Sequence, residues 1–121
     1  MLLKLEKALL NLTGPRADLK DMPHSHSLAL FHICQEALAN AAKHAGAKSV
    51  QVAVWVTKDR VLMEIHDDGR GFHIEKMSTT IGHGLSNMQT RARGVGGEMD
   101  ITSTPGEGTT ILAWVPRAVK L

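Results

Sequence analysis

Between residues 50 and 67, inward-facing apolar residues recur at every second position, and this pattern is the strongest constraint on the fold. Valine occupies positions 50, 52, 54 and 56, and after a Lys58-Asp59 turn apolar residues return at every second position from Val61 to Ile65. A period of two places such side chains on one face of a β-strand. The pattern predicts a hairpin with one buried face, and its second strand runs directly into the acidic, glycine-rich stretch at residues 67–72.

Helical spacing elsewhere predicts two helices beside this hairpin. The first covers residues 27–45, with Ser25 or Ser27 as its N-cap and Gly46 as its stop. The second covers residues 85–93 and follows a glycine pair. Both segments are amphipathic, so each helix needs a partner surface, and the hairpin offers one.

The remaining segments complete a single domain over residues 1–121. Leucines at helical spacing and a weak alternation predict a helix and a short strand within residues 1–23, and residues 99–103 and 109–115 predict a final hairpin. The order of elements favours an α/β fold of the two-layer α+β kind, with a mixed sheet and the helices on one face.

Composition and charge exclude several classes of protein. The net charge of +2 is too small for a dedicated nucleic-acid partner, and 3% aromatic residues are too few for a platform that stacks single-stranded bases. Cys34 is the single cysteine, so no intramolecular disulfide can form. No apolar run approaches the roughly 20 residues that span a bilayer. We therefore expect a cytoplasmic protein, with any membrane anchor of its parent outside this stretch.

The long helix carries a polar face with an unusual set of groups. At 100° per residue, Asn40, Lys43 and His44 lie within about 80° of Glu36. A solvated helix face is one interpretation. The other is a Mg²⁺–phosphate site, because carboxylate and amide oxygens suit a hard cation and an ammonium group suits phosphate.

Asp67 follows three inward-facing apolar residues and so points toward the core itself. A buried carboxylate is costly unless it is hydrogen-bonded, so Asp67 either caps a neighbouring backbone or accepts a bond from a ligand. An adenine amino group is such a donor. Gly69 and Gly71 follow, and glycines there allow a sharp turn and the close approach of a flat ring to the backbone.

Two further glycine pairs stand near predicted helix and strand ends. Gly82-His83-Gly84 precedes the second helix and is either a flexible turn or a phosphate site made of free N–H groups at a helix N-terminus. Gly106-Glu107-Gly108 forms the turn of the last hairpin, and Thr109 begins its second strand. Neither pair belongs to a P-loop or a Rossmann fingerprint.

Taken in order, these pieces resemble the N-box, G1, G2 and final glycine box of the gyrase, Hsp90, histidine-kinase and MutL ATPase superfamily. The resemblance covers residues 28–115 and rests on four motifs: Glu36–Asn40–Lys43–His44, Asp67-x-Gly69-x-Gly71, Gly82-x-Gly84-Leu85 and Gly106-x-Gly108-Thr109. It implies a Bergerat-type ATP-binding fold with a short ATP lid at residues 73–86. The runs at 35–45 and 84–88 are most similar to two-component sensor histidine kinases of the nitrate-sensor or DesK-like type.

For the adenine end of the nucleotide, the resemblance implies the following roles. Asp67 would accept a hydrogen bond from the adenine amino group, directly and through water. Gly69 and Gly71 would bring the backbone beneath the ring, and Thr109 would act through the same water.

For the phosphate end, the resemblance implies a Mg²⁺ ion held by the amide oxygen of Asn40. Glu36 would polarise or deprotonate the nucleophile, and Lys43 and His44 would contact phosphates. Backbone groups of Gly82, Gly84 and Leu85 would cradle the phosphates. Such a site transfers a phosphoryl group mainly by positioning and charge neutralisation.

The resemblance also implies partners for the chain. The γ-phosphoryl group of ATP would pass to a histidine on a separate dimerisation domain and then to an aspartate of a response regulator. This fragment would be monomeric and its parent kinase a homodimer. The chain itself lacks the phosphoacceptor box of the family, so it should not phosphorylate itself. Gln89-Thr90 also stands where relatives often carry Arg-Glu.

Three other interpretations remain at this point. The first is a serine kinase resembling anti-sigma factors, and the second is a module that binds adenine nucleotides without transferring phosphate. The third is a zinc site built from His24, His26 and His32, although the further ligands that zinc prefers are missing.

Overall fold

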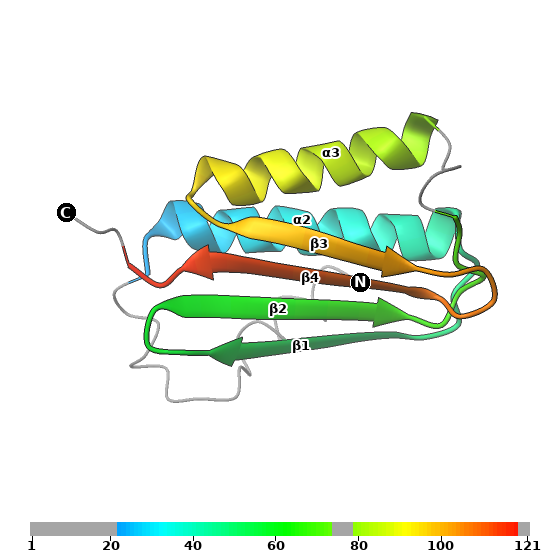
Figure 1. The fold of residues 1–121 in the computed structure, drawn as a ribbon, viewed down its shortest axis with the longest axis horizontal. Coiled ribbons are helices and arrows are strands. Elements are labelled where there is room, and N and C mark those ends of the chain that lie inside the picture. The colour runs from blue at the N-terminus through cyan, green and yellow to red at the C-terminus, as the bar shows by residue number, and fades with distance from the viewer. Residues whose placement is uncertain (1–21, 74–78, 119–121) are drawn as a thin grey trace.

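The computed structural model describes residues 22–73 and 79–118, which form two layers (Figure 1). The elements are α2 (His24–Lys43), β1 (Val50–Val56), β2 (Arg60–Asp67), α3 (Thr79–Gly94), β3 (Glu98–Ser103) and β4 (Thr109–Pro116). Both helices lie against the same face of one sheet and run along its strands. The predicted two-layer α/β architecture with helices on one face is confirmed.

The four strands of this sheet follow the order β1-β2-β4-β3, and each described pair is antiparallel. The prediction of a mixed sheet is wrong for these strands. β2 and β3 point the same way, but β4 lies between them, so they do not bond to each other. Short turns join β1 to β2 and β3 to β4, and tight turns produce antiparallel pairs. The helix and strand predicted within residues 1–23 fall almost entirely outside the described residues.

Alternation along the central strands decides which side chains meet the helices. Every second residue of β2 and β4 is buried, and α2 contributes a stripe of small and branched side chains to the same core. Complete burial of a side chain such as Met63 stabilises the fold by about 1.5–3 kcal/mol. The core between sheet and helices includes Leu30, Ile33, Cys34, Ala37, Val61, Met63, Ile65, Met88, Ile111, Ala113 and Val115.

Both helices begin earlier than predicted. α2 begins at His24, and the carbonyl of Pro23 accepts hydrogen bonds from His26 N and Ser27 N at 3.0 and 3.3 Å. The predicted serine cap is wrong, because no side chain caps this helix and the fixed φ of proline already prepares the first turn. α2 ends at Lys43, and Gly46 follows with a φ of 59°. None of the described helices is long and apolar enough to cross a membrane.

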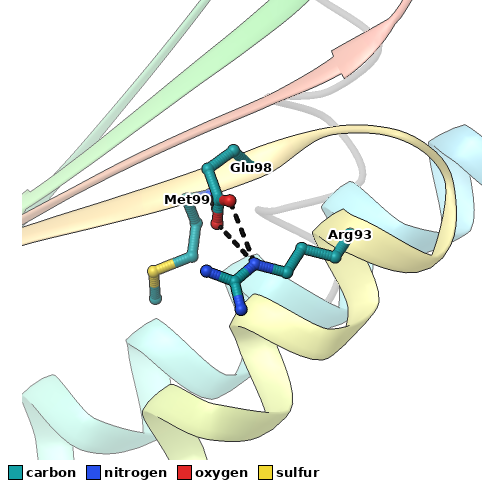
Figure 2. A network of polar contacts seen from close by, with 3 residues as sticks. All are labelled: Arg93, Glu98 and Met99. Atoms are coloured by element: carbon teal, nitrogen blue, oxygen red, sulfur yellow. Dashed lines mark hydrogen bonds and ion pairs between the residues drawn. The ribbon is translucent and has the colours of Figure 1, made fainter.

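The C-terminal end of α3 is tied to the strand that follows it (Figure 2). Arg93 Nε donates to both carboxylate oxygens of Glu98 at 3.2 and 3.0 Å. The N–H of Met99 donates to Glu98 Oε1 at 3.1 Å, and this bond, with the Arg93 guanidinium and the side chain of Gln89, lowers the pKa of Glu98. Gln89 and Arg93 are one turn apart, so both reach the same carboxylate. These contacts fix α3 along the sheet edge.

Cys34 provides a direct test of this packing. Its side chain has no exposed surface, and burial raises the pKa of the thiol from 9.0 to about 12. Since the thiolate is the reactive form, we expect a thiol-modifying disulfide reagent at pH 8 to label native protein only as fast as it unfolds, and to label denatured protein at once. The stability due to this neutral thiol is complete below pH 9 and is lost as the pH rises toward 12. Rapid labelling of native protein would contradict this packing.

Candidate functional site

A small cavity lies where the ends of β2 and β4 meet the C-terminal half of α2. The antiparallel register pairs Asp67 with Thr109, so both residues occupy one row at this end of the sheet. The cavity has a volume of about 40 Å³, which is room for one or two water molecules. A ring system therefore needs its walls to move apart. Its lining comprises Ala37, Asn40, His44, Ala45, Ile65, Asp67, Gly71, Phe72, Leu85, Ile101, Thr109 and Ile111.

Asp67 is the buried acid of this cavity, with 7% of its surface exposed. Its Oδ1 accepts a hydrogen bond from the N–H of Gly69 at 2.8 Å. Among the described residues, no hydrogen-bond donor reaches Oδ2. The capping interpretation is therefore confirmed for Oδ1, and the ligand interpretation stays a prediction for Oδ2.

The loop after β2 and the β3–β4 turn pack backbone against backbone beside the cavity. The N–H of Gly106 donates to the Arg70 carbonyl at 2.7 Å. A Cβ atom on Gly71 would overlap the carbonyl oxygen of Thr104, and one on Gly108 would overlap the carbonyl oxygen of Asp67. Both glycines also have φ values that favour glycine, 65° and 78°. They therefore allow two protein segments to approach each other closely, a role that the sequence interpretation gave to neither glycine.

The same loop is also fixed to the end of α2. The N–H of Arg70 donates to the Ala45 carbonyl at 2.9 Å. A Cβ on Gly69 would collide with Ala45, so Gly69 is required for this packing, and it does not line the cavity. The loop after β2 is thus hydrogen-bonded on one side to the residue Ala45 that follows α2 and on the other side to the β3–β4 turn.

The four predicted site residues on α2 and at its C-cap do not share one environment. Asn40 and His44 line the cavity, whereas Lys43 is exposed and Glu36 lies outside it. The buried stripe of α2 passes through Ala37 and Ala41, so Asn40 and His44 stand at its border, whereas Lys43 is turned toward solvent and Glu36 toward α3.

Glu36 lies in a separate groove between α2 and α3. The groove measures about 320 Å³ and is lined mainly by polar side chains, among them His32, Asn87 and Arg91. Glu36 packs so closely against Gly84 that a Cβ on that glycine would overlap Glu36 Oε1. Gly84 therefore lets the two helices approach with the carboxylate between them.

The second glycine pair lies inside α3. The predicted helix start at Gly82–Gly84 is wrong, because α3 begins at Thr79. An α-helix leaves only its first four N–H groups without an intrahelical acceptor, so Gly84 and Leu85 lie beyond them. Leu85 instead contributes a buried side chain to the cavity wall. Residues 79–86 of the predicted lid are helical, and residues 74–78 lie outside the described residues.

The comparisons with known proteins agree with this geometry. Residues 25–119 match the family described as histidine kinase-, DNA gyrase B- and HSP90-like ATPases. The chain belongs to this ATPase family. Three sensor-type relatives illustrate how close the similarity is: sensor histidine kinase YdfH of Bacillus subtilis, the histidine-protein kinase/phosphatase DegS of the same organism, and UhpB of Salmonella typhimurium, also named a histidine-protein kinase/phosphatase.

YdfH is 40% identical over 88 residues, which are 71% of this ATPase domain and 22% of YdfH. DegS is 40% identical over 91 residues, or 74% and 24% of the two chains. UhpB is 34% identical over 96 residues, or 79% and 19%. The chain therefore spans a quarter or less of the length of these relatives.

A solved structure has the same fold. The blue-light activated histidine kinase of Erythrobacter litoralis superposes with a TM-score of 0.66, over 81% of this ATPase domain and 32% of that chain. The two sequences are 23% identical over the match. At that identity the likeness concerns the fold, and it agrees with the two-layer arrangement of Figure 1.

Most of the apolar walls of this cavity were not part of the sequence prediction of the site, which named only Leu85 among them and only for its backbone. Ile65, Ile111 and Ile101 come from three neighbouring strands, and Phe72 and Leu85 approach from the loop and from α3. The alternation that marked Ile65 as buried could have found it and Ile111, since each lies two residues from a site residue on the same face, Ile65 before Asp67 and Ile111 after Thr109. Nothing in the pattern marked Phe72 or Ile101.

A wider hollow of about 440 Å³ lies at the opposite end of the sheet. Two of its polar side chains are already engaged within the domain. The ring of His26 donates through Nδ1 to the Pro116 carbonyl at 2.7 Å, and the Arg60 guanidinium stacks 3.8 Å from the centre of the Trp114 ring. Judged by volume alone, this hollow would be the better candidate for a ligand site. The smaller cavity is preferred because it contains the buried carboxylate with an available oxygen.

Metal ligands are sparse in the described part of this ATPase domain. No group of three or more His, Cys, Asp or Glu residues there is placed to hold a metal ion. His26 is also a poor zinc ligand, because its ring is hydrogen-bonded to the Pro116 carbonyl, and this weakens the zinc interpretation. Mg²⁺ differs from zinc in this respect, because it commonly takes one or two protein oxygens and completes its shell with water and phosphate.

Proposed function

We propose that this domain binds Mg-ATP in the cavity between β2, β4 and α2 and transfers its γ-phosphoryl group to a histidine of a separate dimerisation domain in a longer sensor kinase. One observation carries the proposal: the buried Asp67 keeps one oxygen for a ligand at the end of an otherwise apolar cavity. An adenine ring fits that chemistry, since it has an apolar face and an amino group that donates hydrogen bonds.

The wall of the cavity supports adenine as the bound ring. Branched aliphatic side chains and Phe72 offer flat apolar contact, and Thr109 adds a hydroxyl beside Asp67. The present cavity is too small for the ring, so binding requires Leu85 or Phe72 to move. Leu85 belongs to α3, so its movement would shift this helix as well.

Asn40 and His44 define where the phosphates would lie. Both line the same cavity from α2, at the side facing solvent. We assign the Mg²⁺ ligand role to the Asn40 amide oxygen, and phosphate contacts to His44 and to the exposed Lys43. The bound Mg²⁺ would neutralise charge on the transferred group.

We assign Glu36 the role of activating or orienting the nucleophile. Its carboxylate lies one helical turn from Asn40, in the polar groove outside the nucleotide cavity. That position separates the acid from the adenine and leaves it accessible to a side chain from another domain. In the proposed role it accepts a proton from, or orients, the incoming imidazole. The parent would be a cytoplasmic-facing homodimer that signals to a response regulator.

A chimera tests the transfer. Residues 25–119 of this chain would replace the matched segment of DegS, and autophosphorylation would be measured with γ-labelled ATP. We expect acid-labile, alkali-stable label, which marks phosphohistidine. Acid-stable label on serine would favour the serine-kinase alternative. The chimera could instead bind ATP without acquiring label, with Glu36→Gln changing neither result. That outcome would favour a nucleotide-binding module without transfer.

The metal assignment makes a separate prediction. Asn40→Ala removes the amide oxygen, and we expect the Kd of Mg-ATP to rise about 10- to 100-fold, since interactions of charged partners contribute about 1.5–3 kcal/mol. Binding of ATP in excess chelator should change far less. Asn87→Ala, on α3 and outside the cavity, is the matched control. Equal losses with and without Mg²⁺ would rule out the metal role of Asn40.

A further inference from the structure

The polar end of the cavity extends one strand beyond the residues assigned so far. The register pairs Asp67 of β2 with Thr109 of β4, and Thr109 with Ser103 of β3. The three residues therefore form one row across the sheet. Ser103 is half-buried, and its Oγ lies 2.8 Å from Thr109 Oγ1.

The Ser103 hydroxyl has three polar contacts. It accepts a hydrogen bond from Phe72 N at 3.0 Å, and it lies 3.2 Å from the Gly108 carbonyl oxygen, to which it can only donate. The third contact is the one to Thr109. A hydroxyl has one proton and two acceptor positions. All three contacts can be hydrogen bonds at once only if Ser103 accepts from Phe72, donates to Gly108 and accepts from Thr109, and we adopt this assignment.

This assignment determines whether the Thr109 hydroxyl can donate a hydrogen bond to a ligand or only accept one. Its only hydroxyl proton points to Ser103, so its oxygen presents lone pairs to the cavity. Asp67 presents its Oδ2, which is also an acceptor. Residues paired across antiparallel strands lie about 4.5–5.5 Å apart at Cα, so the two acceptors face one edge of a bound ring. That edge must carry hydrogen-bond donors.

We propose that Ser103 is a positioning residue that holds Thr109 as an acceptor and thereby helps the site to select 6-aminopurine over 6-oxopurine nucleotides. An amino group at position 6 places donors against the row, whereas an oxo group places a third acceptor there. Without Ser103 the Thr109 proton is free to turn into the cavity, where it meets an oxo group favourably. The inference rests on the proposed binding of ATP in this cavity.

The test compares ATP with inosine triphosphate, which carries the 6-oxo group. Calorimetry on the chain as it stands, with Mg²⁺ present, should give wild-type protein a clear preference for ATP. In Ser103→Ala we expect the ratio of the two affinities to fall about tenfold, the size of one hydrogen bond. Ser103→Thr keeps the hydroxyl and should restore the ratio. Thermal unfolding of each variant checks that the comparison is between folded proteins.

A mutant cycle shows whether Ser103 acts through Thr109. Thr109→Val should lower the same ratio, and adding Ser103→Ala to it should lower the ratio no further. Additive losses would overturn the inference, and so would equal weakening of both nucleotides by Ser103→Ala. If wild-type protein bound neither nucleotide, the proposed function itself would fail. ATP binding that depends on Asp67 but keeps its ratio in Ser103→Ala would overturn this inference alone.

Discussion

Replacing Asp67 by asparagine is expected to remove measurable ATP binding and leave the domain folded. The amide oxygen of asparagine can still accept the bond from the N–H of Gly69, so the loop after β2 keeps its cap. The amide nitrogen then replaces the available oxygen and sets a donor against the adenine amino group. Losing a charged hydrogen bond and opposing two donors costs about 3 kcal/mol or more, roughly a hundredfold or greater rise in Kd.

The neighbouring Asp68 is the matched control for this experiment. It is exposed, and its carboxylate accepts bonds from Lys48 N, Ser49 N and Ser49 Oγ at 2.8–3.0 Å. The backbone bond from Ser49 is the main cause of its lowered pKa. Asp68→Asn should reduce the stability of this loop and leave the Kd of ATP within about twofold, because its side chain does not line the cavity.

Calorimetry with ATP and ADP would measure both variants, and circular dichroism would confirm that each is folded. Tight binding retained by Asp67→Asn would refute the adenine assignment. Equal loss in both variants would point to the whole loop and leave Asp67 without a special role.

Gly71→Ala is expected to destabilise the domain by more than about 3 kcal/mol, because it combines a left-handed backbone with a direct collision. Gly71 has a φ of 65°, and an added Cβ would overlap the carbonyl oxygen of Thr104. That carbonyl belongs to the β3–β4 turn, which bonds the same loop through Gly106 and Arg70. The turn would have to move away, taking Thr109 with it, so we expect ATP binding to be lost as well.

Gly106→Ala separates the two causes. Gly106 has a φ of 82°, but no atom lies within 4 Å of the position of an added Cβ. It should therefore show only the backbone cost, about 1–2 kcal/mol. Denaturant unfolding of both variants measures the difference. If Gly71→Ala proved no worse than Gly106→Ala, the backbone contact between loop and turn would not be tight in solution.

Much of this domain could be predicted from the sequence because its strands obey a period of two. The alternation through Val61 and Ile65 turned Asp67 inward, and the structure buries that carboxylate. The same reasoning placed Thr109 at the start of the last strand. Helical periodicity found both described helices, and a turn at Lys58-Asp59 gave the first hairpin its register. These features depend on residues that are close together in the chain, so a single sequence is enough to predict them.

The remaining features depend on contacts between distant segments. A helical wheel placed Glu36 with Asn40, but only the packing of α3 through Gly84 shows that they face different hollows. Gly82 and Gly84 looked like a helix start because glycine usually interrupts helices, and tertiary contact overrides that weak preference. Ser103 carried no signal at all, since its importance comes from partners at Phe72 and Thr109.

The position of β4 has a consequence for how the chain acquires its structure. β4 is the last described strand along the chain, yet it lies inside the sheet and pairs with both β2 and β3. Until residue 116 has left the ribosome, β3 has no partner among the described strands and one edge of β2 is unpaired. Synthesis of the domain is therefore nearly finished before cooperative folding can begin. A stop codon before Thr109 would divide the sheet and remove one wall of the proposed nucleotide cavity. We therefore expect such a shortened chain to stay unfolded and to be degraded by proteases.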